Sequence, residues 1–350
     1  MKKITFPLFL LWGFFCCTIQ AQDPQLSQNY ATPMYLNPAF TGGTDDSRAS
    51  LLHRIQWPKI GAVFNTSVFS FDHNFEEYNS GVGLMVSTTQ ISEAALKTTE
   101  IHSSYGYRLK LDEEWAIRSG LQLGYAIRSL GFSQLTFGDQ YDNNGLTGAL
   151  TAERFATDQI SYLDINSGTV IYNKRFWLGV AGHHLNRPSQ DIVRIQGQNR
   201  LPIRFSVHGG VRLPLSKYEH RPFGRKYRQN YETEEANLSP MFLYKRQGNF
   251  DQLDIGAYFA YESLVLGLWY RGIPIKQYVR GIYNNESIVA LVGVHYNGIH
   301  VGYSYDHTIS NLAGNTGGVH EITLSYLFEP YAVRHGTKTK NRGGLPTPEF

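Results

Sequence analysis

Polar and apolar side chains alternate at every second position in many stretches of about ten residues along this chain. In the segment IHVGYSYDH (299–307), Ile299, Val301 and Tyr303 fall on one face, and polar or small residues fall on the other. The segment VHEITLSYLF (319–328) follows the same pattern. Because successive side chains of a strand point to opposite faces of a sheet, each stretch predicts a β-strand. Strands of a soluble β-sandwich have the same period, so the connections decide the architecture.

The connections between these stretches alternate between tight turns and long polar loops. Strand signals predict about fourteen strands, an even number, as in bacterial single-chain membrane barrels. The predicted strands lie near residues 47–58, 62–73, 80–91, 97–111, 114–129, 160–173, 175–187, 201–215, 241–247, 251–262, 263–272, 287–296, 299–308 and 318–328. Short turns are expected at Asp112-Glu113, Lys174, Glu262-Ser263 and Asn297-Gly298, and longer loops near 130–159, 188–200, 273–286 and 309–317. We therefore predict an all-β fold, a transmembrane antiparallel up-and-down β-barrel of about 14 strands in the outer membrane, with the short turns in the periplasm.

The composition agrees with a membrane barrel. Aromatic residues make up 14% of the 350 residues and charged residues only 17%, as expected where Tyr and Trp form girdles at both membrane interfaces. After the amino-terminal segment, no stretch approaches the roughly 20 apolar residues of a membrane-spanning helix. The formal net charge of +3 is too small for the basic surface of a nucleic-acid-binding protein, so we expect no nucleic-acid partner.

The amino terminus has the features of an export signal. Two lysines precede an apolar run from Ile4 to Ile19, and Ala21 offers a small residue at a cleavage point. We predict a signal peptide over residues 1–21, and prefer it to an inner-membrane anchor because the run is short and no basic residue follows it closely. Both cysteines of the chain lie inside this segment, so the mature protein would contain no thiol.

Three further segments complete the predicted organisation. Residues 22–46 form an amino-terminal arm, in which Pro33 and Pro38 argue against a central strand. The arm is too apolar for a solvated linker, so we expect it to line the lumen or to lie against the periplasmic rim. Residues 47–328 form the barrel, and residues 329–350 form a flexible periplasmic tail with basic residues. Both termini are thus expected in the periplasm.

The sequence contains no pattern that predicts catalysis, a cofactor or a metal ion. It has no nucleophile elbow, P-loop or HExxH motif, and a strand would point the adjacent His183 and His184 to opposite faces. The segment DQYDNNG (139–145) lacks the alternating oxygen ligands of a calcium loop and predicts an external turn. His300 and His320 are expected to face the lumen as hydrogen-bonded histidines. We therefore predict a non-enzymatic protein with no catalytic, cofactor-binding or metal-binding residues.

Three motifs resemble one known family. They are DPQLSQNYATPMYLNPAFTG (23–42), FGDQYD (137–142) and SYDHTISNLAGNTGGVHEITLSYLF (304–328). Together they are similar to the PorP/SprF family of outer-membrane proteins of the Bacteroidota, over nearly the whole mature chain. The resemblance implies an integral outer-membrane barrel associated with type IX secretion and gliding motility. It further implies a role in the export or surface anchoring of large secreted adhesins.

Candidate partner-binding residues lie in the arm and in the long segment 216–240, which falls on the predicted periplasmic side. In the arm they are Gln25, Tyr30, Pro33, Tyr35, Asn37, Pro38 and Phe40, and in the long segment they are Arg221, Arg225, Lys226 and Arg228. The basic residues of this segment precede acidic ones, so it is either a docking surface or a solvated loop. The expected partners are outer-membrane lipid, a secreted adhesin or other type IX substrate at the external loops, and a periplasmic secretion-complex or peptidoglycan-associated protein.

A general diffusion channel for small solutes, similar to a porin, is the alternative function. A barrel of about fourteen strands is wide enough to conduct if its lumen is open. The residues expected to face the lumen are mostly small, with few charges: Gly81, Gly83, Gly120, Gly124, Gly256, Gly267, Gly302, Arg118, Arg128, Asp254 and Arg271. Small residues either leave an open hole or make room for a plug, and the sequence leaves both possibilities open.

Overall fold

The computed structural model describes residues 23–45, 47–61, 63–92, 95–132, 135–152, 158–192, 200–215, 236–279, 282–328 and residue 345. The predicted signal peptide, the basic residues of the predicted tail, and the candidate residues Arg221, Arg225, Lys226 and Arg228 lie outside the described residues. Within the described ranges, no helix is long and apolar enough to cross a membrane.

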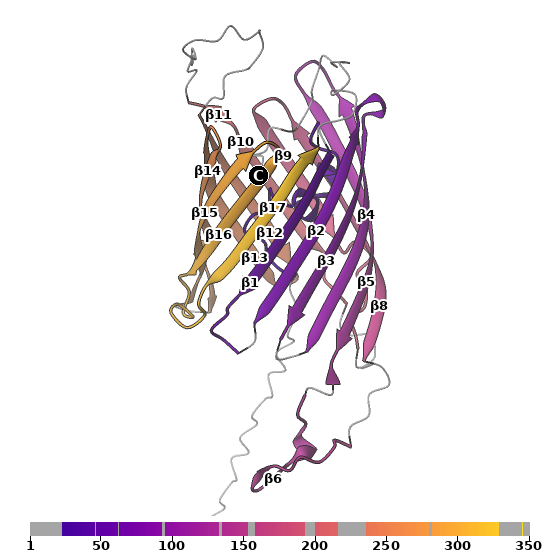
Figure 1. Ribbon diagram of the computed structural model, residues 1–350, viewed down its shortest axis with the longest axis vertical. Coiled ribbons are helices and arrows are strands. Elements are labelled where there is room, and N and C mark those ends of the chain that lie inside the picture. The colour runs from indigo at the N-terminus through magenta and orange to yellow at the C-terminus, as the bar shows by residue number, and fades with distance from the viewer. Residues whose placement is uncertain are drawn as a thin grey trace, which may run out of the picture.

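Fourteen long strands form one closed antiparallel barrel, which confirms the predicted fold class (Figure 1). The strands are β1 (Ser47–Gln56), β2 (Phe64–Phe75), β3 (Ser80–Ile91), β4 (Leu96–Lys110), β5 (Ala116–Leu130), β8 (Gln159–Tyr172), β9 (Phe176–His183), β10 (Arg204–Val211), β12 (Asn237–Gln247), β13 (Phe250–Tyr261), β14 (Leu264–Val279), β15 (Ile282–Tyr296), β16 (Ile299–Thr308) and β17 (Val319–Phe328). Each pairs with its neighbour along the chain, and β1 closes the ring by pairing with β17, where Ser47 lies opposite Phe328.

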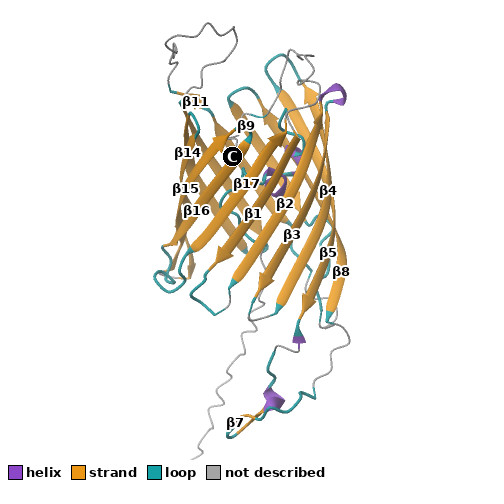
Figure 2. Ribbon diagram, viewed as in Figure 1, coloured by secondary structure: helices purple, strands orange, loops and turns teal. Residues whose placement is uncertain are grey.

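Several short elements lie in the connections and inside the ring of strands. The hairpin of β6 (Tyr141–Asp142) and β7 (Gly145–Leu146) and the 3-10 turn η4 (Gly138–Gln140) lie in the connection after β5, and β11 (Leu213–Pro214) extends the pairing of β12. The 3-10 turn η2 (Glu76–Tyr78) connects β2 and β3. The helix α1 (Pro33–Leu36) and the 3-10 turn η1 (Pro38–Phe40) precede β1, and Figure 2 shows them inside the ring of strands.

The two ends of the barrel differ in their connections. At one end, named here the turn mouth, the strands are joined by short turns such as residues 173–175, 262–263 and 297–298. Asn297 and Gly298 have φ angles of 51° and 79°, and two such residues in succession form the tight hairpin turn that fits the twist of the strands. At the other end, named the loop mouth, the connections 131–158, 184–203 and 309–318 are long. The loop mouth is at the bottom of Figure 1.

The strands present an apolar face outward and a polar face inward, as β17 illustrates. Glu321 is 1% exposed and faces the lumen, whereas the next residue, Ile322, is 51% exposed on the outer surface. Leu324 continues this outer face beside Leu51 and Val301 of the neighbouring strands. An apolar outer band over a polar interior is the pattern that lipid requires of a barrel wall.

Two sequence-based expectations are wrong in detail. Residues 273–286 form no long loop, because β14 and β15 continue to Val279 and from Ile282. The pairing slips between Ile273 and Gln277, and this bulge accommodates Pro274, which has no N–H to donate to the ladder. His320 faces outward, where the Tyr303 hydroxyl lies 2.8 Å from its Nδ1, because its neighbour Glu321 takes the inward position.

Candidate functional site in the barrel lumen

Residues 23–45 form an arm that runs through the lumen from the loop mouth to the turn mouth. At the loop mouth, the Asp23 N–H donates to the side chain of Gln247, the last residue of β12, at 3.1 Å. At the turn mouth, the Gly42 N–H donates to the carboxylate of Asp72 at 2.9 Å, and Asp72 pairs with Arg48 near the start of β1. The lumen is therefore occupied by the protein's own chain.

Prolines set the local shape of the arm. Pro33 starts α1 and Pro38 starts η1, positions at which the missing N–H costs no helical hydrogen bond. Asn37, between them, has an extended backbone, and its side chain accepts a hydrogen bond from the Ala39 N–H at 2.8 Å. The Asn37 amide also donates to the carbonyl of Val180 on β9 at 3.1 Å. The same residue thus caps a helical turn and ties the arm to the wall.

An aromatic cluster packs the middle of the arm against the wall. The ring of Tyr30 lies edge-on to three rings, with centroids 6.4 Å from Phe40, 6.1 Å from Trp177 and 6.5 Å from Tyr258. These four side chains are all buried, and edge-on contacts are a preferred arrangement of aromatic pairs. Burial of each such side chain contributes roughly 1.5–3 kcal/mol. The arm is therefore a packed part of the barrel's core.

Glycines of the wall make room for the arm. A β-carbon on Gly120 would lie 2.2 Å from the carbonyl oxygen of Pro38, and one on Gly302 would lie 2.5 Å from the side-chain oxygen of Gln28. Gly81 and Gly83 likewise face the arm, whereas Gly124, Gly256 and Gly267 accommodate large side chains of the wall itself. Of the two possibilities left open by the sequence, the second therefore applies to four of these glycines, which make room for a plug.

Buried charges bind the backbone of the arm. The Glu321 carboxylate accepts hydrogen bonds from the N–H groups of Ser27 and Gln28, at 3.0 and 2.6 Å, and lies 3.0 Å from Arg54. A carboxylate removed from water needs such partners. The network continues on neighbouring strands through Asp306, Arg271 and Asp254.

The start of the arm is held by a second charged cluster at the loop mouth. The Asp23 carboxylate lies 2.8 Å from Arg204 and 2.8 Å from Nε2 of His184, and Nδ1 of His184 lies 2.8 Å from Asp164. Burial alone would raise the pKa of Asp23, but His184 and Arg204 outweigh it and hold this pKa well below its usual range. Burial alone would lower the pKa of His184, in the connection after β9, but Asp23 and Asp164 raise it to about 10. This cluster is therefore charged at neutral pH.

The turn-mouth end of the arm is fixed by backbone contacts. The Arg118 guanidinium donates to the Thr41 carbonyl oxygen at 2.6 and 3.0 Å. Leu345 is the one described residue beyond β17, and its N–H donates to the Gly43 carbonyl at 3.1 Å. The Leu345 side chain is buried in the same core as the arm's aromatic residues. The arm is thus attached at both mouths and along its middle.

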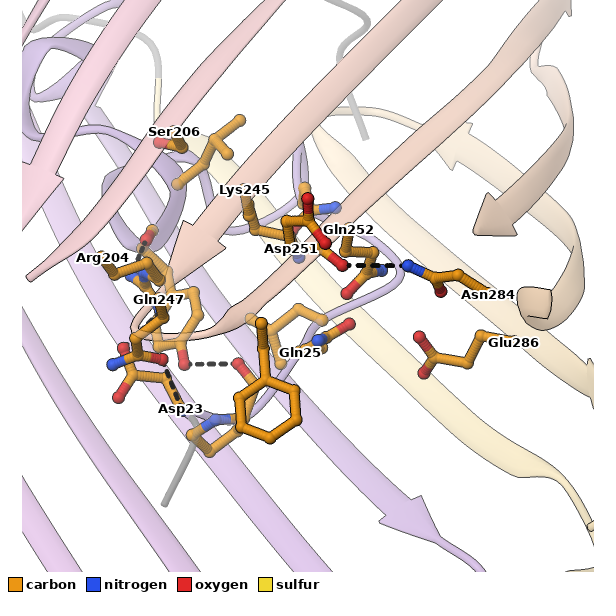
Figure 3. Close-up of a pocket in the computed structure, with 16 residues that line it drawn as sticks. Asp23, Gln25, Arg204, Ser206, Lys245, Gln247, Asp251, Gln252, Asn284 and Glu286 are labelled. Atoms are coloured by element: carbon orange, nitrogen blue, oxygen red, sulfur yellow. Dashed lines mark hydrogen bonds and ion pairs between the residues drawn. The ribbon is translucent and has the colours of Figure 1, made fainter. Parts of the chain in front are cut away.

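A cavity of about 1040 Å³ remains between the start of the arm and the loop mouth. Arm, wall and loop residues all contribute to its lining, among them Gln25, Tyr35, Tyr162, Gln190 and Leu312. A side pocket of about 90 Å³ adjoins it, and Figure 3 shows Lys245, Gln252 and Glu286 around this pocket. Among the described residues, no three or more His, Cys, Asp or Glu side chains are placed together to hold a metal ion.

The candidate residues predicted from the sequence divide into three groups. Five residues of the arm are buried inside the barrel: Tyr30, Pro33, Asn37, Pro38 and Phe40. Gln25 and Tyr35 line the cavity, and the four basic candidates lie outside the described residues. Sequence reasoning missed Glu321, although a carboxylate amid the small polar residues on the inner face of β17 was a usable signal.

Comparison with known families decides where this plugged barrel belongs. The family model described as "Type IX secretion system membrane protein PorP/SprF" matches residues 18–326. The chain belongs to the PorP/SprF family. This PorP/SprF protein is accordingly a type IX secretion system membrane protein with an outer-membrane-type β-barrel. No curated protein matches it.

Solved structures of bacterial barrels resemble this PorP/SprF protein at low identity. A Pseudomonas aeruginosa FadL homologue is 10% identical, with 85% of this chain and 94% of that chain covered and a TM-score of 0.41. The toluene transporter TodX of P. putida is 10% identical, with 84% and 93% covered and a TM-score of 0.43. The outer membrane protein Omp33 of Acinetobacter baumannii is 6% identical, with 82% and 100% covered and a TM-score of 0.43.

Proposed function

We propose that this PorP/SprF protein is a non-enzymatic, plugged outer-membrane barrel of the type IX secretion and gliding motility system. In this role it helps to export large secreted adhesins or to anchor them at the cell surface. The observation that carries the proposal is the packed lumen: from Leu26 to Phe40, nearly every side chain of the arm is buried against the wall. A barrel filled in this way is suited to holding a partner at its mouth.

The packed lumen also argues against the alternative, a general diffusion channel. A ring of fourteen strands conducts solutes only if its interior is open, and here the Glu321 network and the Tyr30 cluster fix the arm across it. Purified protein in a planar lipid bilayer should therefore show no stable open state. A steady conductance of the size expected for an unplugged barrel would favour the solute channel.

We infer that the loop mouth faces the cell exterior, since long loops of such barrels are extracellular and short turns periplasmic. The end of β17 at Phe328 then lies on the periplasmic side. Asp23, however, lies at the loop mouth, so the arm begins on the external side of the lumen. This orientation differs from the expectation that both termini are periplasmic.

The proposed partners follow from this orientation. A secreted adhesin or other type IX substrate would meet the loop mouth with its cavity, and outer-membrane lipid would cover the apolar outer band. A periplasmic secretion-complex or peptidoglycan-associated protein would meet the turn mouth, where Leu345 lies against the end of the arm.

The proposal is tested by deleting the gene and measuring the proteins of the cell surface and the medium by proteomics. Loss of all type IX cargo would identify a core component, and loss of one large surface protein would identify a dedicated partner of that protein. Reintroducing the wild-type gene should restore the missing proteins in either case. Unchanged secretion and an unchanged surface proteome would overturn the proposal.

A further inference from the structure

The strand β8 has an incomplete neighbour on one side. It pairs with β5 along nearly its whole length, from Gln159 to Tyr172. It pairs with β9 only from Ser167 to Tyr172, because β9 ends at His183. Residues 159–166, next to the loop mouth, therefore have no strand on their second side among the described residues.

The free edge presents backbone groups in a defined order. The Ile165 carbonyl accepts from the Leu185 N–H at 2.9 Å, and the Asn186 side chain bonds the Ile165 N–H and the Leu163 carbonyl at 3.2 and 2.7 Å. Alternate residues of a strand point their backbone groups to the same side, so the Leu163 N–H and both backbone groups of Ser161 face this edge. No residue of the described ranges bonds them.

The position and composition of this edge are those of a site where a strand can be added. Unpaired backbone groups do not persist in hydrocarbon, so the edge at Ser161 and Leu163 must lie on the aqueous side, at the loop mouth. The Leu163 side chain is 66% exposed there. An added β-strand binds to free backbone donors and acceptors, and an exposed apolar side chain beside them provides further contact.

The inner face of the same stretch borders the large cavity. Tyr162, Asp164 and Asn166 of β8 line it, so alternate side chains of a strand paired to β8 would point into the cavity. Its volume of about 1040 Å³ is at the upper limit of the roughly 300–1,000 Å³ of small-molecule pockets. The space suits several side chains of a polymer.

The charges of the cavity favour a polypeptide over a lipid tail. Neither Arg128 nor Glu286, which both line it, forms an ion pair with a described residue. Figure 3 shows Glu286 beside the side pocket with no dashed contact. The Arg128 guanidinium donates only to the neutral side chain of Gln190, at 2.6 Å. The cavity thus offers one charge of each sign without a counter-ion among the described residues, next to apolar residues such as Leu201 and Phe250. A hydrocarbon chain would leave both charges away from water and without counter-ions.

We propose that an extended segment of the secreted partner pairs with the edge of β8 at Ser161 and Leu163 and places alternate side chains in the cavity. This inference rests on the proposed function, and names the chemistry by which the barrel holds its client. Every other side chain of the segment should be polar or charged where it meets Arg128 and Glu286, and the opposite face should be apolar beside Leu163.

Proline substitutions test the hydrogen bonds directly in the full-length protein in its own cells. Ser161→Pro and Leu163→Pro each remove an N–H that points away from the β5 ladder, where proline is tolerated in an edge strand. Ser161→Ala and Leu163→Ala lose the side chain but keep the N–H, so each is the reference for the proline variant at its own position. The readout is the amount of the surface protein, identified by its loss in the gene deletion, that co-purifies with each variant. Because hydrogen bonds add roughly 0.5–1.5 kcal/mol each, the double proline variant should retain about tenfold less partner than the double alanine variant. Ser161→Ala alone should retain wild-type amounts.

Cross-linking gives an independent test that does not need a proline variant to assemble. A photoreactive phenylalanine derivative in place of Ser161 should cross-link to one contiguous segment of that same surface protein. Cross-links to a second copy of this chain or to lipid would overturn the inference, as would undiminished partner recovery with the assembled double proline variant. An unchanged surface proteome after gene deletion would instead overturn the proposed function. The two failures are therefore distinguishable.

Discussion

Gly120 of β5 and Pro38 of the arm approach so closely that a β-carbon at position 120 would lie 2.2 Å from the Pro38 carbonyl oxygen. Two elements about eighty residues apart in sequence are therefore shaped to each other. The contact is between backbone atoms, so neither side can yield by a rotamer change. The wall at this level has no room for both a larger residue and the arm.

Replacing Gly120 by valine should displace the arm. Overpacking of a filled interior costs about 1–3 kcal/mol, and the displaced arm would open a lumen that is wide enough to conduct. Gly120→Val protein in planar bilayers should thus show open states that the wild-type protein lacks. Gly138→Val is the matched control, because nothing lies within 4 Å of a β-carbon there. Equal conductance of Gly120→Val and wild type, with the barrel assembled, would contradict the assignment of the arm as a plug.

Removing the charge of Asp23 should release the start of the arm. The Asp23→Asn variant loses the ion pairs with Arg204 and His184, both at 2.8 Å, and leaves Arg204 without its carboxylate. Breaking a buried pair costs about 3 kcal/mol. The amino-terminal residues should then be cleaved faster by an added protease, while Asp158→Asn, at an exposed position before β8, should be cleaved at the wild-type rate. No change in cleavage would show that the ion pairs of Asp23 do not hold the start of the arm.

The barrel should lose stability at alkaline pH, because His184 in the loop-mouth cluster then loses its proton and its ion pairs. The pKa of His184 is raised to about 10, so its contribution is complete below its ordinary value near 6.5 and is lost as the pH rises towards 10. The lowered pKa of Asp23 acts in acid: its contribution is complete above its ordinary value near 3.9 and falls as the pH drops below it. The wild-type unfolding temperature should therefore decrease between pH 6.5 and 10. His184→Gln should unfold at a lower temperature at pH 6 and lack most of this decrease; an identical slope in both proteins would exclude His184 as its cause.

The strands were predictable because polar and apolar side chains alternate along each of them, a pattern that is visible within a few residues. A period of two fixes which residues face lipid, and the bounds of β16 and β17 follow from it almost unchanged. The prediction of strand bounds was wrong where this alternation is interrupted. Residues 273–286 were expected to form a long loop, whereas β14 continues through Pro274 by means of a bulge.

The contents of the lumen were not predictable in the same way. Ser27 and Glu321 are 294 residues apart, and no periodic pattern connects a carboxylate on the last strand with the backbone of the arm. The apolar and proline-rich composition of the arm indicated packing against some surface. The surface it packs against includes glycines of five strands, and no local pattern connects these strands with the arm.

The orientation of the barrel is testable at two positions with opposite expected exposure. Asn144 lies in the connection between β5 and β8 at the loop mouth, Lys174 lies in the turn between β8 and β9, and both are exposed. Because both cysteines of the chain lie in the predicted signal peptide, Asn144→Cys and Lys174→Cys would each give a mature protein with one thiol. A membrane-impermeant maleimide should label Asn144→Cys in intact cells and Lys174→Cys only after the outer membrane is permeabilised. The reverse pattern would place the cavity and the free edge of β8 in the periplasm, and a secreted protein at the cell surface could then not be the partner bound there.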